Sequence, residues 1–316
     1  MIRGKIPPFF IGIPIYFKAF SFMAGWPWPA VLFFFFLLTA FVNEFVSIVG
    51  SLVWKRFFGG KRCRFFPPPV VCIFYRPKES FPGGLVWPGI FYTAAFILDD
   101  EVWRHELRHV KDSLWMSALG YLFLAGFFTG IYAQVTWNVR DLFITSAKLS
   151  SILAYLLTLY AGEFFAYRAD KTPLPIAAER LRETAPLRGI PFKQAPFILA
   201  TLVLVTYYVG RISPDLADDV KTAVAIGSAL VLAIVLRWAL GVFTRRLFGI
   251  DVGDFLFSSF IAGAILHPLL GVVTSFLFSW AMFGKAKDAA VAAAVAALSL
   301  FAVLLPGLIW TSVLLL

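Results

Sequence analysis

"WPAVLFFFFLLTAFVNEFVSIVGSLVW", residues 28 to 54, is an apolar run in which Glu44 is the only charged side chain. A helix needs about 20 such residues to cross the roughly 30 Å of hydrocarbon in a bilayer. The run therefore predicts a membrane-spanning helix. The chain as a whole is similar in composition, with 60% hydrophobic and 15% charged residues among 316. A water-soluble domain needs a more polar surface, so we expect a polytopic membrane protein.

Further apolar runs of comparable length follow along the chain. They cover residues 113 to 137, 142 to 162, 195 to 210, 222 to 243, 254 to 283 and 289 to 316, and residues 6 to 25 are a weaker candidate. These runs predict seven or eight membrane spans and a fold that is mainly α.

Basic residues gather in three of the loops between these runs, at residues 55 to 64, 168 to 193 and 245 to 246. Cytoplasmic loops of membrane proteins are enriched in Lys and Arg. We therefore interpret the net charge of +10 as a signal of orientation and not of nucleic-acid binding. The three loops are assigned to the cytoplasm, and the bilayer is the expected partner.

Cys63 and Cys72 are the only cysteines. We expect two unpaired thiols in a reducing compartment, with a single bridge as the alternative. Asn and Gln are scarce, with Asn43, Asn138, Gln134 and Gln194 as the complete set. Scarcity of these thermolabile amides is typical of proteins from hot environments.

The segment between the first two clear apolar runs is not membrane-like. Two stretches rich in β-branched and aromatic residues, 70 to 75 and 89 to 96, are separated by Pro and Gly and predict a pair of strands. Acidic residues at 99 to 101 then favour the start of a helix, which no Gly or Pro interrupts before Gly120. A strand pair followed by a helix is therefore expected here.

That helix contains the motif His-Glu-Leu-Arg-His at residues 105 to 109. Positions four apart share a helix face, so His105 and His109 can offer imidazole nitrogens to one zinc ion. Glu106 would act as general base and activate a zinc-bound water. The alternative is that the motif binds no metal and is only a charged helix end, with Glu106 and the neighbouring arginines facing solvent.

Two histidines leave a zinc site one protein ligand short. In zincins that use a glutamate as third ligand, this residue stands on a later helix, often as E-x-x-A, and the candidate here is Glu163. The topology supports it, because the chain crosses the membrane twice after His109 and so returns to the same side. Ala166 and Asp170 lie on the same side of that helix as Glu163, where Ala166 allows close packing and Asp170 can orient a ligand. The alternative is an interfacial Glu163 paired with Arg168 or Lys171.

This combination of motif, helical hairpin and glutamate resembles the integral-membrane gluzincin metalloproteases, the family of the bacterial heat-shock membrane protease and the CAAX prenyl endopeptidase. The resemblance covers roughly residues 28 to 170. It implies a zinc endopeptidase with His105, His109 and Glu163 as ligands and Glu106 as base. It also implies that the strand at 89 to 96 pairs with an extended substrate. The family usually has Asp four residues after the ligand glutamate, where this chain has Tyr167.

We therefore expect a small zincin-like α+β catalytic module at the cytoplasmic interface of a helical membrane protein. The expected regions are residues 1 to 54, an N-terminal membrane segment; 55 to 193, the catalytic module with an inserted hairpin at about 113 to 162; and 194 to 316, a four-helix membrane region. Zn²⁺ is the expected cofactor, and membrane proteins or membrane-proximal peptides are the expected substrates.

Two other classes of protein remain open. Charged residues within the apolar runs, namely Glu44, Lys148 and Arg237, would suit a transporter or a structural subunit in which the motif is accidental. A site-2-type intramembrane protease would instead take its third ligand from Asp251 or Asp254. His267, beside Pro268, is expected to bond a backbone carbonyl freed by the proline and not a metal.

Overall fold

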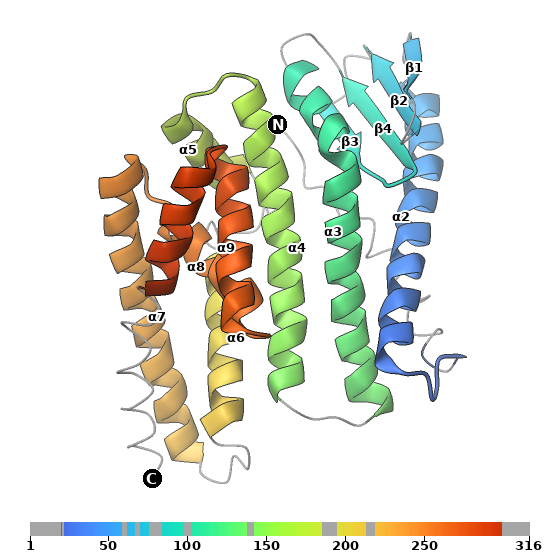
Figure 1. Ribbon diagram of the computed structural model, residues 1–316. Helices are drawn as coiled ribbons and strands as arrows, with labels where there is room; N and C mark the ends of the chain where they lie inside the picture. Colours follow the sequence, from blue (N-terminus) through green and yellow to red (C-terminus); the bar gives the residue numbers. More distant parts are fainter. Residues whose placement is uncertain are drawn as a thin grey trace. The chain divides into compact units, whose positions relative to one another are not determined.

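The structure is a computed structural model that describes residues 20, 22–58, 62–66, 70–75, 84–97, 103–137, 142–184, 195–212 and 219–298. It is mostly helical, with one small sheet (Figure 1). The helices are α2 (Trp28–Phe58), α3 (Trp103–Thr136), α4 (Leu142–Ala169), α5 (Leu174–Thr184), α6 (Ala195–Ile212), α7 (Asp219–Phe248), α8 (Gly253–Ala264) and α9 (Pro268–Phe283), and a further helix covers residues 286 to 298. The strands are β1 (Arg62–Phe66), β2 (Val70–Tyr75), β3 (Gly84–Trp87) and β4 (Tyr92–Ile97).

The chain forms two compact units. The first contains Met1–Thr129 and Thr158–Lys193, and the second contains Gly130–Leu157 and Gln194–Leu316. The first unit holds α2, the sheet, the first part of α3, the last part of α4, and α5. The second holds the connected ends of α3 and α4 together with α6 to α9.

The sheet has four strands in the order β1-β2-β4-β3. β2 and β4 run parallel, with Val70 opposite Tyr92, while β1 and β3 are antiparallel to their neighbours. The predicted strand at 70 to 75 is confirmed, and the one predicted at 89 to 96 begins at Tyr92 and ends at Ile97. β4 is therefore an inner strand, and β3 is an edge strand in the described part of the chain.

Both faces of the sheet are covered, which explains why nearly every side chain of β4 is buried. One face packs against α3. Its buried residues are Val71, Ile73, Val86, Ala95, Ile97 and Val110, with Trp103 and Leu107 beside them. The other face, which holds the stacked pair Phe74 and Phe96, contacts α2. The start of α3 is thus fixed against the sheet by apolar packing.

Three described helices are long and apolar enough to span a membrane: Trp28–Val53 within α2, and the whole of α3 and α4. A fourth span is reached if the bent pair Ala233–Phe248 and Gly253–Ala264 counts as one. The structure therefore supports a membrane protein with three or four spans among its described residues, and the larger number stays a prediction. The candidate span at 6 to 25 and residues 299 to 316 lie almost entirely outside the described residues.

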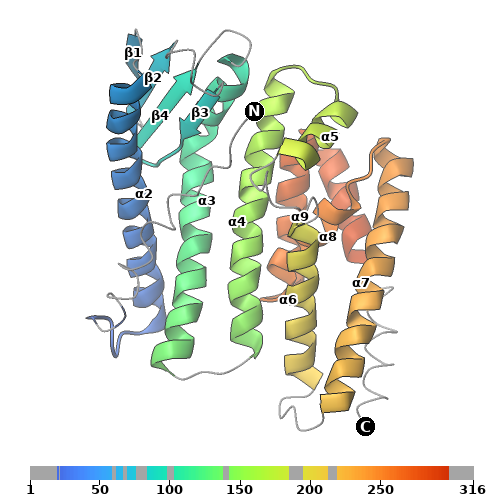
Figure 2. The ribbon, with the colours of Figure 1, turned by 180° about the vertical axis from the view of Figure 1, so that it is seen from behind.

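The second unit contains one clear departure from the expected spans. Residues 254 to 283 form two helices, α8 and α9, instead of one. The break falls where His267 caps α9 and Pro268 occupies its first turn, because proline suits the start of a helix and not its interior. α8 is short and almost completely buried, packed against α6, α7 and α9 (Figure 2).

The expectation of unpaired thiols is wrong for Cys72. This residue lies in β2 and is disulfide-bonded, and the described residues contain no free cysteine. Cys63, in the adjacent strand β1, is the only other cysteine of the chain. Antiparallel neighbours bring these two sequence positions together, which residue spacing alone did not decide.

Candidate metal centre

The motif at 105 to 109 lies in the first turns of α3, and the helix divides its side chains between two neighbours. Trp103, Leu107 and Val110 pack on the sheet. His105 and His109, which are four residues apart, face another direction and their imidazoles approach each other. Packing of the apolar side against the sheet therefore orients the histidine side.

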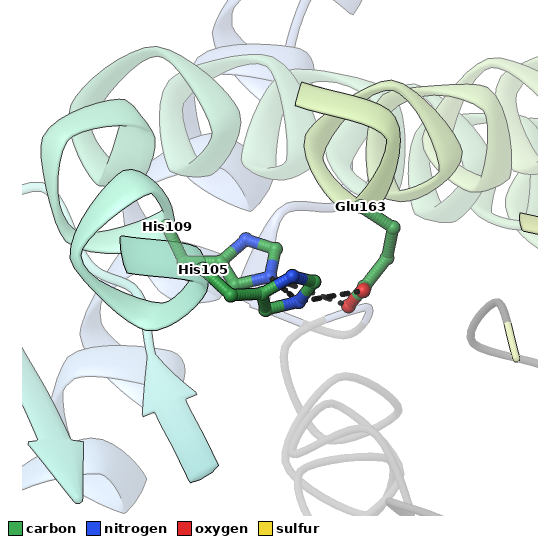
Figure 3. Close-up of side chains that lie close together, drawn as sticks. All are labelled: His105, His109 and Glu163. Atoms are coloured by element: carbon green, nitrogen blue, oxygen red, sulfur yellow. Dashed lines mark hydrogen bonds and ion pairs between the residues drawn. The ribbon is translucent and has the colours of Figure 1, made fainter. Parts of the chain in front are cut away.

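Glu163 reaches the histidines from α4, as Figure 3 shows. Met116 of α3 fills the space beside the preceding Gly162, where an added Cβ would overlap the end of its side chain. Ala166, one turn further, is completely buried. Small residues thus flank Glu163 on α4.

Three potential ligand atoms converge. His105 Nε2 lies 3.3 Å from His109 Nε2 and 3.5 Å from one Glu163 oxygen, while His109 Nε2 lies 3.6 Å from the other oxygen. Ligands about 2 Å from a tetrahedral zinc ion stand about 3.3 Å apart. The observed separations therefore fit a zinc ion with an open fourth position. This is the one group of His, Cys, Asp or Glu in the described residues that could hold a metal.

Asp170 contacts the back of the same ligand. One of its carboxylate oxygens lies 3.3 Å from Nδ1 of His105, so the imidazole can donate there while Nε2 faces the ligand group. Histidine ligands of metals usually make such a bond, which fixes the ring and its tautomer. Tyr167 packs edge-on against the His105 ring, with centroids 4.9 Å apart, a contact that the sequence did not indicate.

Glu106 is buried, and its Oε2 has no hydrogen-bond partner among the described residues. An orphaned carboxylate oxygen is costly unless a ligand or reactant satisfies it. Its position directly after His105 is the one that a general base occupies in this motif. The donor set and this free oxygen both fit a catalytic metal.

If the motif were only a charged helix end, Arg108 would face solvent without a protein partner, but it has two partners. Its Nε donates to Asp112 at 2.6 Å, and its guanidinium lies 4.8 Å from the centre of the Phe165 ring on α4. Arg168 donates to the carbonyl of Thr172. Arg108 and Arg168 therefore have partners other than the three ligand candidates, whereas Arg104 is exposed.

Asp251, Asp254 and His267 belong to the second unit. Asp251 accepts hydrogen bonds from Arg245 and from the backbone N–H of Gly253. His267 caps α9 by accepting from the N–H of Leu269, where we expected it to bond a carbonyl freed by Pro268. None of the three joins the potential ligand group.

No family model, no curated protein and no solved structure matches this chain. The inference about its chemistry therefore rests on the site itself. A His-His-Glu group beside a buried carboxylate can bind a divalent metal and carry out metal-assisted hydrolysis.

Proposed function

We propose that the protein is a zinc-dependent endopeptidase that hydrolyses peptide bonds of membrane proteins or membrane-proximal peptides. The observation that carries the proposal is the convergence of His105, His109 and Glu163 at separations that suit one tetrahedral ion. The resemblance to the membrane gluzincins supports the same assignment, since these three positions match that family's ligands.

The residues have distinct roles in this reaction. His105, His109 and Glu163 would hold zinc, which supplies Lewis-acid chemistry by lowering the pKa of a coordinated water and polarising a carbonyl. Glu106 accepts a proton from the attacking water and delivers it to the leaving amine nitrogen. Asp170 keeps His105 in the orientation that ligation needs.

The strand that we assign to substrate binding differs from the one that the family resemblance implied. β4 has a hydrogen-bonded neighbour on each side over residues 94 to 97, so most of it is closed to another strand. β3 has a neighbour on one side only among the described strands. We therefore assign strand addition of an extended peptide to the free edge of β3.

The histidines lie in the first turns of a helix that is itself long enough to span a membrane. Zinc would therefore sit close to the interface, and we propose that this is the cytoplasmic one, on the basis of the basic loops. A disulfide at Cys72 is compatible with a cytoplasmic site in a hyperthermophile, whose intracellular proteins retain disulfides.

The proposal is tested by the zinc content of the purified protein, measured by mass spectrometry. We expect one zinc per chain in the wild type, loss of zinc in His109→Ala and Glu163→Ala, and unchanged zinc in Glu106→Gln. Peptide hydrolysis should fall in all three variants, by at least about a thousandfold in Glu106→Gln, because the base is removed while the metal stays.

Each contrary result identifies a different alternative. A wild type that takes up no zinc, even after zinc is added back, would make the motif accidental and favour a transporter or structural subunit. Zinc binding without hydrolysis of any peptide in a random library would indicate an inactive zincin that serves as a binding module.

A further inference from the structure

Glu44 lies in the span of α2, and its carboxylate accepts several hydrogen bonds. Its Oε1 accepts from the backbone N–H groups of Ile90 and Phe91, at 2.6 and 3.2 Å, and its Oε2 accepts from that of Tyr92 at 2.9 Å. The Tyr121 hydroxyl donates to Oε1 at 3.3 Å. Four donors thus converge on one buried carboxylate.

Two of the backbone donors, Ile90 and Phe91, belong to the turn that joins β3 to β4, and the third, Tyr92, begins β4. Consecutive N–H groups that point into one concavity form an anion-binding nest. Gly89 makes the approach of the carboxylate feasible, because a Cβ there would stand 2.6 and 2.7 Å from the two Glu44 oxygens. Asn43, the preceding residue of α2, donates to the carbonyl of Pro88 at 3.1 Å. The turn is thus bonded to α2 from Pro88 to Tyr92.

Side chains on both sides of the turn also contact α2. Trp87, the last residue of β3, lies against Gly50, where a Cβ would stand 2.4 Å from its ring. Tyr92, the first residue of β4, shares a hydrogen bond of 2.9 Å with Ser51. The end of the edge strand and the beginning of the inner strand are therefore both attached to the same helix.

Tyr121 connects Glu44 and the β3–β4 turn to α3. It is a buried residue of this helix, which also carries His105 and His109. Its hydroxyl donates to Glu44 and receives a short hydrogen bond from Asn43. Glu44 is the point at which α2, α3 and the β3–β4 turn meet.

We propose that Glu44 is a positioning residue for the substrate. By holding the β3–β4 turn against α2 and α3, it fixes the free edge of β3 relative to α3, the helix that carries His105 and His109. This role rests on the proposed peptidase function. It assigns to an intramembrane charge a task in substrate binding, instead of the transport role that such charges suggest.

Glu44→Gln is the most informative change. The amide of glutamine keeps one acceptor oxygen, but its NH₂ group faces a backbone N–H and cannot bond it. Glu44→Ala removes all the acceptors. We expect amide hydrogen exchange at residues 84 to 97 to quicken in both variants, more in Glu44→Ala. Ser47→Ala, which removes a buried hydroxyl one helical turn away, is the matched control.

The kinetic test uses a quenched fluorescent peptide chosen from a random library as one that the wild type cleaves. We expect Glu44→Gln to raise KM about tenfold with kcat within about twofold, because strand pairing contributes to binding and not to the chemical step. A peptide of the same sequence that is N-methylated on alternate amides cannot pair as a strand. We expect its kcat/KM to be low and to be the same in the wild type and in Glu44→Gln.

The results separate this proposal from the function on which it rests. Unchanged zinc content in Glu44→Gln shows that the site still assembles. If exchange quickens while KM stays at the wild-type value, or if the methylated peptide is affected as strongly as the unmethylated one, the positioning role is overturned and the peptidase stands. If the wild type binds zinc and cleaves no peptide, the function fails, and the exchange data still report whether Glu44 holds the turn.

Discussion

Three carboxylates at the candidate metal centre have different surroundings, and each suits a different role. Glu163 faces two imidazole nitrogens, which suits a ligand. Asp170 faces the outer nitrogen of His105, which suits an orienting group. Glu106 is buried with one oxygen unpartnered, which suits a base. The same chemical group can thus serve in three ways within one small site.

Asp170→Asn should weaken zinc binding about 10- to 100-fold without unfolding the protein, because His105 loses a charged acceptor behind its ring. Competition with a chromophoric chelator measures the affinity. Glu179→Gln removes a carboxylate from the exposed side of α5 and provides the control. Equal affinities in wild type and Asp170→Asn would remove Asp170 from the site.

The histidine pair was predictable because helix periodicity alone places residues four apart on one face. Glu163 followed from the sequence pattern of zincins with a glutamate ligand, and the number of membrane crossings agreed with it. The contact of Asp170 with His105 was harder to predict, since Asp170 lies beyond the end of α4, where Lys171 has a φ of 60°. The partners of Glu44 could not be predicted, because backbone N–H groups of a turn have no signature in side-chain sequence.

At the scale of elements, the length of each apolar run decided which strands and helices could be predicted from the sequence. β2 and the core of β4 are apolar runs and were found, whereas β1 contains two arginines and β3 has only 4 residues between loops. Such short strands are stabilised by their neighbours more than by intrinsic preference. The division between α8 and α9 was missed although Pro268 signalled it, because the apolar run continues through the break.

The α8–α9 pair depends on Gly263. A Cβ at this position would stand 2.3 Å from the backbone carbonyl oxygen of Leu270, which cannot move aside as a side-chain tip can. We expect Gly263→Ala to destabilise the protein by about 1–3 kcal/mol. Gly227→Ala on α7 is the control, because a Cβ there meets nothing within 4 Å. Thermal unfolding in detergent measures both.

Zinc content should stay at the wild-type value in folded Gly263→Ala, because every ligand candidate belongs to the other unit. Loss of zinc from the folded variant would show that the two units depend on each other for the metal centre.

At the scale of the whole molecule, composition was sufficient to predict a helical membrane protein, and described helices support that class. The number of spans was harder to predict, because an apolar run does not distinguish one long helix from two short ones. Orientation depends on two observations that favour different compartments in a mesophile, the basic loops and the disulfide at Cys72.

Labelling of an engineered cysteine tests the orientation directly. We expect Glu179→Cys, on exposed α5 in the same unit as the metal centre, to react with a membrane-impermeant maleimide only after cells are permeabilised. A cysteine placed at Trp137, which is exposed directly after the last residue of α3, should react in intact cells. The reverse pattern would place the site on the outer side, where disulfides form readily.

The bonding of Glu44 also has a consequence for biosynthesis. α2 leaves the ribosome before the β3–β4 turn and before α3, so its carboxylate enters the membrane ahead of all four of its donors. An acidic side chain near the middle of a newly inserted helix costs about 3 kcal/mol. The strongly apolar residues around Glu44 offset this cost during insertion. The backbone N–H groups of the β3–β4 turn then compensate it by hydrogen bonding to the carboxylate. The order of synthesis therefore means that α2 enters the bilayer with the Glu44 carboxylate lacking its hydrogen-bond donors, and that segments made later supply them.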